Sequence, residues 1–391
     1  MKHLKHPLPE SPASATPPAR LGYRMPAEWE PHEATWVTWP HNTTDWPGKF
    51  APIPWVYADI IRRLSRSENV RILNRNADEQ ERAIRMLNKA GANAAMVEFH
   101  RAGTNRSWTR DYAPVFLVRG NRECQSSDGQ SQLALTKWKF NGWAKYADHI
   151  LDNKAGEVIA RFAACPVWKP AGGAPIKRAV MEAGSFDVNG QGLLITTEEC
   201  LLSKVQQRNP GFSRHDIEGL FAGHLGIKKV IWLRQGIAGD DTHGHVDDLA
   251  RFTDASTIVL ALEDDPSEIN YEPLRENLAL LKQARDLQGQ PLRIVTLPMP
   301  QPVVFEGQRL PASYANFYIA NGMVLVPTFN DPNDRIALQI LSELFPNRKV
   351  TGIHCLDLVL GLGTLHCMTM QQPAITIAKS NTGNLNRNRH R

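Results

Sequence analysis

The sequence predicts a cyclic, propeller-like α/β body within a single chain of 391 residues. Strand-like and helix-like segments alternate, and the last three long helices begin about 60 residues apart, each followed at once by a strand. Asn-Gly pairs between strand-like runs add hairpin turns, so the expected unit is a hairpin, a helix and a strand. Five or six such units fit into the chain, which favours one ring over the two or three domains that length alone allows.

Apolar residues spaced three and four apart predict the helices. The expected helices cover residues 57–67, 78–90, 155–163, 213–225, 271–287 and 334–345. Ser213 and Asp334 stand where helix N-caps are expected, because their side-chain oxygens can accept from the free N–H groups of a first turn.

Runs that are rich in β-branched and aromatic residues predict the strands. The expected strands cover residues 35–39, 70–73, 115–118, 193–196, 229–233, 258–262, 293–297 and 323–327. Asn189 with Gly190, and Asn321 with Gly322, lie between strand-like runs and predict type I′ hairpin turns.

The two ends of the chain have the composition of disordered tails. Residues 1–21 are dominated by Pro, Ala, Ser and Lys, and residues 380–391 form a basic run. We therefore expect an N-terminal tail at 1–21, one folded domain at 22–379 and a C-terminal tail at 380–391. With 42% hydrophobic residues, the chain can bury a large core.

Charge and hydropathy exclude several classes of partner. Lys and Arg number 45 against 40 Asp and Glu, and a net charge of +5 gives nucleic-acid binding little support. No apolar run approaches the roughly 18 residues of a membrane span, and the start of the chain lacks the apolar stretch of a secretory signal. The expected protein is therefore cytoplasmic, with neither nucleic acid nor membrane as a partner.

The cysteines indicate free thiols. Their number is odd, their spacing is long and irregular, and no C-x-x-C pair is present, which argues against a disulfide framework or a structural zinc knuckle. The five residues are Cys124, Cys165, Cys200, Cys355 and Cys367. One of these thiols could therefore be a nucleophile.

Four short motifs place a reactive side chain beside Gly or Pro, at residues 108–114, 181–184, 239–248 and 361–367. Asp111, Glu182 and His245 are separated by 71 and 63 residues, and Cys367 follows 122 residues later, or two steps of 61. Equal phase in a ring of repeats means equal position relative to the central axis. We therefore expect these four side chains to converge on one pocket.

A thiol, an imidazole and carboxylates suit attack on a cationic carbon such as that of a guanidinium group. Asp111 and Asp247 are the candidates for bidentate pairing with its N–H groups. A Cys367 thiolate would attack the central carbon, and His245 would protonate the departing ammonia and then deprotonate the water that hydrolyses the thiouronium intermediate. This chemistry needs neither a metal nor a cofactor.

Other interpretations of these residues stay open at this point. Cys367 could be a small buried hydrophobe, Glu182 a solvent-facing strand residue, and His245 a core histidine. Asp111 could form an ordinary ion pair beside Arg110.

A second functional hypothesis is a zinc hydrolase. His243, His245 and Asp247 match an H-x-H-x-D pattern, although such a site would need more histidines and Asp248 follows instead. A binding protein without turnover is disfavoured, because Cys367 and His245 are both present.

Longer segments resemble the agmatine deiminase family, a guanidine-modifying group related to microbial peptidylarginine deiminases. The resemblance runs from about residue 22 to residue 373. Its most specific stretches are MPAEWEPHEATWVTWP at 25–40, SWTRDYAP at 107–114, LLITTEECLL at 193–202, RNPGFSRHDIE at 208–218, GDDTHGHVDDLARF at 239–252 and LHCMTMQQP at 365–373.

The resemblance implies a single catalytic domain with the pentein fold, a five-bladed α/β propeller. It implies that Cys367 is the nucleophile, His245 the general acid and base, and Glu182 the residue that orients His245. It also implies that Asp111 and Asp247 bind the guanidinium.

Trp108, in the same motif as Asp111, would pack against the substrate. The implied reaction is hydrolysis of agmatine to N-carbamoylputrescine and ammonia, a step of putrescine biosynthesis, without a cofactor. Another guanidino substrate or an amidino transfer remains an alternative, and a homo-oligomer is possible.

Four departures from the family pattern concern the shape of the pocket. Ala113 and Ala183 stand where glycines are usual, His243 where an aspartate is usual, and Leu362 within a usual glycine triplet. No reactive group is lost, so guanidine chemistry is expected to survive. Apart from Arg110, the motifs hold no arginine to pair with a substrate carboxylate, which favours agmatine over arginine.

Overall fold

The computed structural model describes residues 16–120, 131–173 and 175–375. The short 3-10 helix η1 (Pro18–Leu21) packs against helix α6 (Arg214–Leu225), and Trp168 Nε1 donates to the backbone oxygen of Thr16 over 3.1 Å. The prediction of a disordered tail is therefore wrong for residues 16–21. Their proline content fits an ordered first turn, because proline presets the helical φ. Residues 1–15, 376–391 and Cys124 lie outside the described residues.

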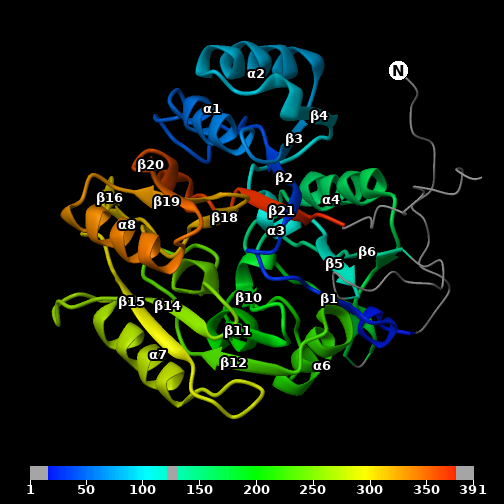
Figure 1. Cartoon of the computed structure of the whole chain (residues 1–391), viewed down its shortest axis with the longest axis vertical. Helices are drawn as coiled ribbons and strands as arrows, with labels where there is room; N and C mark the ends of the chain where they lie inside the picture. Colours follow the sequence, from blue (N-terminus) through cyan, green and yellow to red (C-terminus); the bar gives the residue numbers. More distant parts are fainter. Residues whose placement is uncertain (1–15, 121–130, 174, 376–391) are drawn as a thin grey trace, which may run out of the picture.

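Five sheets of three or four strands, each accompanied by helices on the outside, surround a common centre (Figure 1). Each sheet repeats the predicted unit: an antiparallel pair of strands, a helix, and a third strand parallel to the second. This confirms the predicted α/β fold of hairpin–helix–strand units and sets their number at five.

Four units follow one another along the chain. The first contains β5 (Val115–Arg119), β6 (Leu133–Thr136), α4 (Ile150–Ala163) and β7 (Val167–Trp168), with β1 (Tyr23–Arg24) on its edge. The second contains β10 (Phe186–Val188), β11 (Leu193–Thr197), α5 (Glu198–Leu202), α6 and β12 (Lys229–Leu233). The third contains β13 (Ala250–Phe252), β14 (Thr257–Leu262), α7 (Tyr271–Gln283) and β15 (Arg293–Pro298). The fourth contains β18 (Tyr318–Ala320), β19 (Met323–Thr328), α8 (Pro332–Leu344) and β20 (Lys349–His354).

The fifth unit joins the two ends of the described chain. It contains β21 (Thr369–Pro373), β2 (His32–Thr38), α1 (Ile53–Leu64), β3 (Asn69–Asn74), α2 (Ala77–Ala90) and β4 (Val97–Arg101). Strand β21 pairs antiparallel with β2, and Met370 lies opposite Trp36. Strands β21 (red) and β2 (blue) therefore lie side by side in Figure 1, and the hydrogen bonds between them complete the ring of units.

Both predicted hairpins form, but neither has a type I′ turn. A type I′ turn needs a positive φ at both central residues. In each Asn-Gly pair the glycine has a positive φ, 70° at Gly190 and 72° at Gly322, but the asparagine does not. Asn321 instead bonds to the backbone of His32, accepting from its N and donating to its O. The asparagine thus ties the β18–β19 hairpin to β2.

The capping predictions have a mixed outcome. Ser213 is the N-cap of α6, in a capping box with Asp216, as predicted. Asp334 is not an N-cap: Asp331 takes that place in α8, with Pro332 at the first helical position. Asp334 is the third residue of the helix, and its carboxylate accepts from the backbone N of Asp331.

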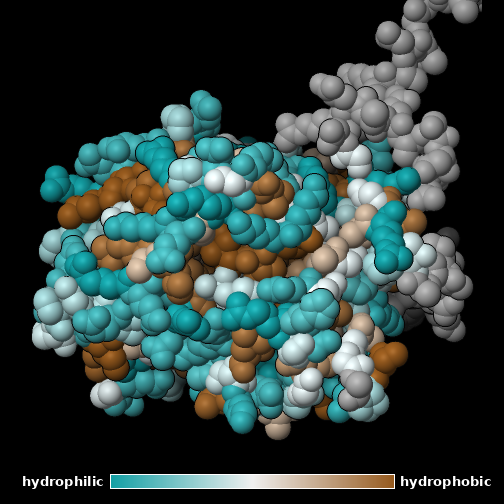
Figure 2. Space-filling model, turned by 90° about the horizontal axis from the view of Figure 1, so that it is seen from below, coloured by the Kyte–Doolittle hydropathy of each residue, from teal (hydrophilic) through white to brown (hydrophobic). Residues whose placement is uncertain are grey.

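Hydrophilic residues dominate the face shown in Figure 2, and hydrophobic ones show in patches between them. Among the described helices, none combines the length and the apolar character that crossing a bilayer would require.

Candidate active site

The residues singled out by their spacing lie just before the first strands of the units. Asp111 precedes β5, Glu182 precedes β10, His245 precedes β13 and Cys367 precedes β21. Asn316, which the sequence analysis missed, holds the same place before β18. It lies between His245 and Cys367 in the sequence, which are two steps of the repeat apart.

These side chains meet at the centre. His245 Nδ1 lies 4.0 Å from Asp111 Oδ1 and 3.9 Å from Asp247 Oδ1, and its Nε2 lies 3.7 Å from Glu182 Oε2. Cys367 Sγ lies 3.8 Å from Asp247 Oδ2. The five residues are buried close together, and two of them, Asp111 and Cys367, line the pocket that opens there.

Gly184 allows this close approach. A Cβ at this position would lie 2.7 Å from His245 Nδ1, 2.9 Å from Asp111 Oδ1 and 3.0 Å from Asp247 Oδ2. Its backbone N also donates to Asp111 Oδ1 over 3.2 Å. The glycine after Ala183 is therefore required by the site itself.

Neither ring nitrogen of His245 has a hydrogen-bond partner among the described residues. Burial alone would lower its pKa, but Asp111, the Cys200 thiol and Glu182 outweigh burial and hold the pKa well above the ordinary value. His245 therefore carries a proton on both nitrogens at neutral pH and can act as an acid.

Asp111 is held by two donors. Trp143 Nε1 donates to its Oδ2 over 2.8 Å, and Gly184 N donates to its Oδ1. Burial raises the pKa of Asp111 to about 6, with Asp247 and Glu182 adding to the shift and His245 opposing it. Trp143 escaped the sequence analysis, since a single tryptophan far from the motif carries no local signal.

Asp247 is held by a histidine that the sequence analysis also missed. His366 Nδ1 lies 2.6 Å from Asp247 Oδ2, and His366 Nε2 lies 2.8 Å from Glu28 Oε2. Burial alone would raise the pKa of Asp247, but His366, and also His245 and Arg251, outweigh it and lower the pKa. Asp247 Oδ1 has no hydrogen-bond partner among the described residues.

Cys367 lies at the end of a Gly-rich turn and directly before β21. Asn316 Nδ2 donates to its Sγ over 3.1 Å. Burial, together with Asp247, Asp248 and Asp111, raises its pKa well above the ordinary value. In the free protein the side chain is therefore a neutral thiol, and a cation placed between the carboxylates would favour the thiolate.

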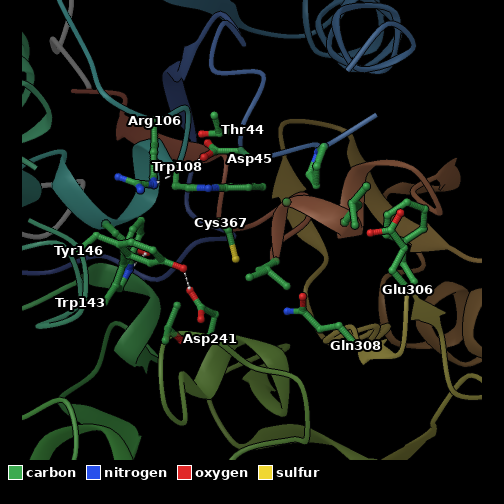
Figure 3. Close-up of a pocket in the computed structure, with 17 residues that line it drawn as sticks. Thr44, Asp45, Arg106, Trp108, Trp143, Tyr146, Asp241, Glu306, Gln308 and Cys367 are labelled. Atoms are coloured by element: carbon green, nitrogen blue, oxygen red, sulfur yellow. Dashed lines mark hydrogen bonds and ion pairs between the residues drawn. The ribbon is translucent and has the colours of Figure 1, made fainter. Parts of the chain in front are cut away.

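A pocket of about 350 Å³ opens onto this thiol (Figure 3). Trp108 lines it, and its ring packs at 5.6 Å, centroid to centroid, against Trp46. A Cβ on Gly361 would lie within 2.8 Å of both tryptophan rings. Gly361 therefore leaves the space in which the Trp46 and Trp108 rings pack.

Among the charged residues that line the pocket, acidic ones outnumber the single arginine, Arg106. Asp45, Asp111, Asp241 and Glu306 line the pocket, with Glu306 at the turn between β16 (Val304–Phe305) and β17 (Gln308–Arg309). Asp241 accepts from Tyr146 over 2.6 Å and pairs with Lys145. Burial raises the pKa of Asp45 to about 7.

Arg106 also lines the pocket and was missed, because it lies one residue before the motif at 107–114. Its guanidinium donates to the backbone and side chain of Asp148 over 3.1 and 2.9 Å. It also lies 3.6 Å from Asp45 Oδ1 and stacks on Tyr146. This arginine is therefore already paired with acidic groups.

The four departures differ in their backbone. Ala113 has an ordinary φ of −65°, and Ala183 lies in a 3-10 helix, so neither place requires glycine. His243 (64°) and Leu362 (67°) adopt the left-handed conformation that favours glycine. Leu362 is the one of the four departures that lines the pocket.

The ligand set of the zinc hypothesis is not brought together. His243 Nε2 lies 3.1 Å from Ser203 Oγ, and its Nδ1 faces Glu199. Within the described part of the chain, the groups that could hold a metal ion are Glu182–Cys200–His245 and Asp247–Asp248–Cys367, and His243 belongs to neither.

A five-unit α/β ring with a thiol, an imidazole and carboxylates in one central pocket defines a guanidine-modifying protein of the pentein fold. The chain belongs to the Porphyromonas-type peptidyl-arginine deiminase family, whose model matches residues 24–373.

The relatives of this chain include agmatine deiminases. It is 35% identical to the agmatine deiminase of Medicago truncatula, over 92% of this chain and 98% of that protein. The structure is similar to the agmatine deiminase of Enterococcus faecalis, with a TM-score of 0.84, 27% identity, and coverage of 94% of this chain and 100% of that one. The substrate-bound agmatine deiminase of Campylobacter jejuni gives a TM-score of 0.77 and 28% identity, over 90% and 96% of the two chains.

Proposed function

We propose that this protein is a cysteine-dependent agmatine deiminase, a hydrolase that converts agmatine and water to N-carbamoylputrescine and ammonia. One observation carries the proposal: two buried polar atoms without hydrogen-bond partners among the described residues, His245 Nδ1 and Asp247 Oδ1, lie 3.9 Å apart. The other oxygen of Asp247 lies 3.8 Å from the Cys367 thiol. Unpartnered buried polar atoms are costly, and a bound guanidinium would supply N–H donors to the carboxylate.

Asp111 and Asp247 hold the guanidinium in this mechanism. Each already accepts on one side, Asp111 from Trp143 and Gly184, and Asp247 from His366. A carboxylate has about four acceptor positions, so both can still take N–H groups of the substrate. Trp108 provides the flat wall on which the planar group packs.

The bound cation offsets the negative charges that raise the pKa of Cys367, so the thiol releases its proton to solvent and the thiolate attacks the guanidinium carbon. Protonated His245 gives a proton to the departing nitrogen, and ammonia leaves with the C–N bond electrons. A thiouronium remains on Cys367. Neutral His245 then takes a proton from water, whose oxygen attacks the same carbon and displaces the thiolate.

Glu182 orients His245 in this scheme. Its carboxylate lies 3.7 Å from Nε2 and is itself paired with Arg208 at 3.3 Å. Burial alone would raise the pKa of Glu182, but Arg208 and His245 outweigh it and keep the pKa low. An ionised Glu182 stabilises the imidazolium that the first step needs.

The acidic lining supports agmatine as the substrate. Agmatine carries a second cation at its far end, whereas arginine also carries a carboxylate. Besides Asp111, which holds the guanidinium, the lining has three carboxyl groups that favour a far-end cation, and its Arg106 is already bound by Asp148. An arginine carboxylate would thus compete with Asp148 or remain unpaired.

Ammonia release from purified protein tests this function with agmatine, arginine, a guanidino acid and a peptidyl arginine as substrates. We expect kcat/KM for agmatine to exceed that for arginine by at least about tenfold, which corresponds to about 1.4 kcal/mol. Equal or faster turnover of arginine would refute the assignment and would indicate that Arg106 exchanges Asp148 for the substrate carboxylate.

The same assay tests the covalent step. Cys367→Ser should abolish ammonia release, because a hydroxyl cannot supply the anion at neutral pH. Cys165→Ser, which changes a buried cysteine of another unit, is the control and should remain active. A strong chelator should not lower the rate, and normal turnover by Cys367→Ser would rule out the mechanism.

A further inference from the structure

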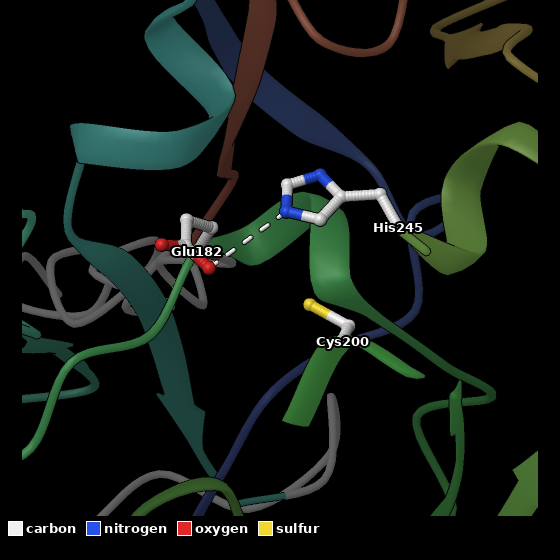
Figure 4. A group of neighbouring side chains, drawn as sticks. All are labelled: Glu182, Cys200 and His245. Atoms are coloured by element: carbon white, nitrogen blue, oxygen red, sulfur yellow. Dashed lines mark ion pairs between the residues drawn. The ribbon is translucent and has the colours of Figure 1, made fainter. Parts of the chain in front are cut away.

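A second group of potential ligands lies on the far side of His245 from the substrate carboxylates. Potential ligand atoms of Glu182, Cys200 and His245 all lie within 4.8 Å of one another, and the three residues are at most 1% exposed. Cys200 comes from helix α5, whose start is held by the N-cap Thr197. Figure 4 shows its sulfur directed toward the imidazole, with the Glu182 carboxylate beside Nε2.

The imidazole itself points to a ligand at this place. Its Nε2 is buried and has no hydrogen-bond partner within the described residues, the nearest carboxylate oxygen being 3.7 Å away. Nδ1 is the nitrogen near Asp111 and Asp247. The substrate carboxylates therefore leave Nε2 available to a different ligand.

We propose that Glu182, Cys200 and His245 form an inhibitory Zn²⁺ site. Thiolate, imidazole and carboxylate are the usual zinc ligands, with bonds of about 2.0 to 2.3 Å. Two ligand atoms of a tetrahedral site are then about 3.3 to 3.7 Å apart, which matches the distance between Glu182 and His245. Binding uses the neutral imidazole, and the protons of the Cys200 thiol and of Nε2 pass to solvent.

The unpartnered Nε2 of His245 favours this group over the second one. Arg208 donates to both oxygens of Glu182, and the carboxylates of Asp111 and Asp247 beside His245 offset its charge. In the group Asp247–Asp248–Cys367, Asn316 donates to Asp248 and to the Cys367 thiol, and Asp247 Oδ2 lies 2.6 Å from His366 Nδ1.

Zinc at this place would stop turnover without blocking the pocket, an effect that rests on the proposed function. A metal on Nε2 prevents His245 from carrying two protons, so the imidazolium that protonates ammonia cannot form. Trp108, Asp111 and Cys367 remain accessible to substrate. Zinc should therefore lower kcat and leave KM for agmatine nearly unchanged, whereas zinc on Cys367 would compete with agmatine.

Cobalt(II) replaces zinc in a test that does not depend on turnover, because a cobalt–thiolate bond gives a charge-transfer absorption band. We expect Cys367→Ser to keep the band and Cys200→Ser to lose it, with Cys200→Ala as a second variant and circular dichroism as the check on folding. Zn²⁺ should displace the cobalt. A band that survives in both folded Cys200 variants, or the absence of any band in Cys367→Ser, would overturn the proposed site.

Kinetics in zinc buffers test the inhibition. We expect kcat of the unmodified protein to fall with zinc while KM for agmatine stays within about twofold. Relative to its own zinc-free rate, Cys200→Ser should need at least tenfold more zinc for half inhibition. Competitive inhibition, or equal zinc sensitivity in the variant, would overturn the inhibitory role. If agmatine is not turned over at all, the proposed function fails while the cobalt spectra still decide the site.

Discussion

His366 bridges two buried carboxylates with its two ring nitrogens. Asp247 Oδ2 lies 2.6 Å from one nitrogen and Glu28 Oε2 lies 2.8 Å from the other. The contact with His366 lowers the pKa of Asp247 against the effect of burial, and it leaves Oδ1 of this carboxylate without a hydrogen-bond partner among the described residues. We therefore regard His366 as a positioning residue that acts through Asp247.

His366→Asn should lower kcat/KM by about 10². It should also shift the fall of kcat/KM at acidic pH to a higher pH. Asparagine can still donate to Asp247, but it removes the His366 interactions that lower the pKa of that carboxyl, so the Asp247 proton stays bound up to a higher pH. The measurement is kcat/KM for agmatine between pH 5 and 9. His354→Asn, which changes an exposed histidine at the end of β20, is the control. A uniform loss of rate without that shift would indicate a merely structural role.

The parent enzyme should itself lose kcat/KM below about pH 6. Burial raises the pKa of Asp111 to about 6, so this carboxylate becomes protonated there and no longer attracts the guanidinium. The substrate does not titrate in this range, because amines ionise near pH 10. A profile that is flat from pH 5 to 7 would contradict the assigned role of Asp111.

At the scale of elements, the candidate reactive residues lie on the short segments between units. The strands that follow fix the positions of these segments. Helix α3 (Thr109–Tyr112) presents Asp111, and η3 (Ala183–Ser185) places Gly184 against it. These turns have little room, because three reactive atoms lie within 3.0 Å of the position that a Cβ on Gly184 would occupy.

Gly184→Ala should reduce kcat by at least about 10², because the added methyl group must displace His245 or the carboxylates, and small misplacements of reacting groups are costly. Gly219→Ala is the matched control. Gly219 lies exposed in α6, and a Cβ there meets nothing within 4 Å. The control should keep its activity and gain about 0.5–1 kcal/mol of stability. Steady-state rates and urea unfolding measure both effects, and an active Gly184→Ala would contradict the assigned geometry.

At the scale of the whole molecule, Glu28 connects several units near the centre. Its carboxylate accepts from the backbone N of Ile319 over 2.7 Å and pairs with Arg251 at 3.0 Å. Glu28 Oε2 also lies 3.4 Å from Arg110 Nη2 and 2.8 Å from His366 Nε2. Burial alone would raise its pKa, but Arg251, His366 and Arg110 outweigh it and hold the pKa well below the ordinary value.

Glu28→Gln should lower the free energy of unfolding by about 3–5 kcal/mol, because it leaves buried cations without their anion. Since the folded-state pKa is lowered, this stabilisation is present above the ordinary pKa of Glu and lost as pH falls through the folded-state value. Urea unfolding at pH 7 measures the difference. Glu98→Gln, at a more exposed ion pair with Arg71, is the control and should cost less than about 1 kcal/mol. Similar losses in both variants would contradict the central role of Glu28.

The repeating unit and the candidate reactive residues could both be predicted from the amino-acid sequence. Apolar spacing and β-branched runs are local signals, so the helices and strands could be placed to within a few residues. The common phase of Asp111, Glu182, His245 and Cys367 indicated one pocket, because equal phase in a ring means equal distance from the axis. Local signals also misled at Asp334 and at residues 16–21, where composition did not reveal the actual cap or the packing against α6.

The groups that contact these residues could be identified only from the three-dimensional arrangement of the chain. Trp143 on Asp111, Asn316 on Cys367, and the bridge of His366 to Glu28 join segments from 32 to 338 positions apart. The pairing of β21 with β2 likewise joins the two ends of the described chain. Such contacts depend on how the units pack around the centre, and no local periodicity encodes them, because period and propensity describe neighbours along the chain rather than neighbours in space.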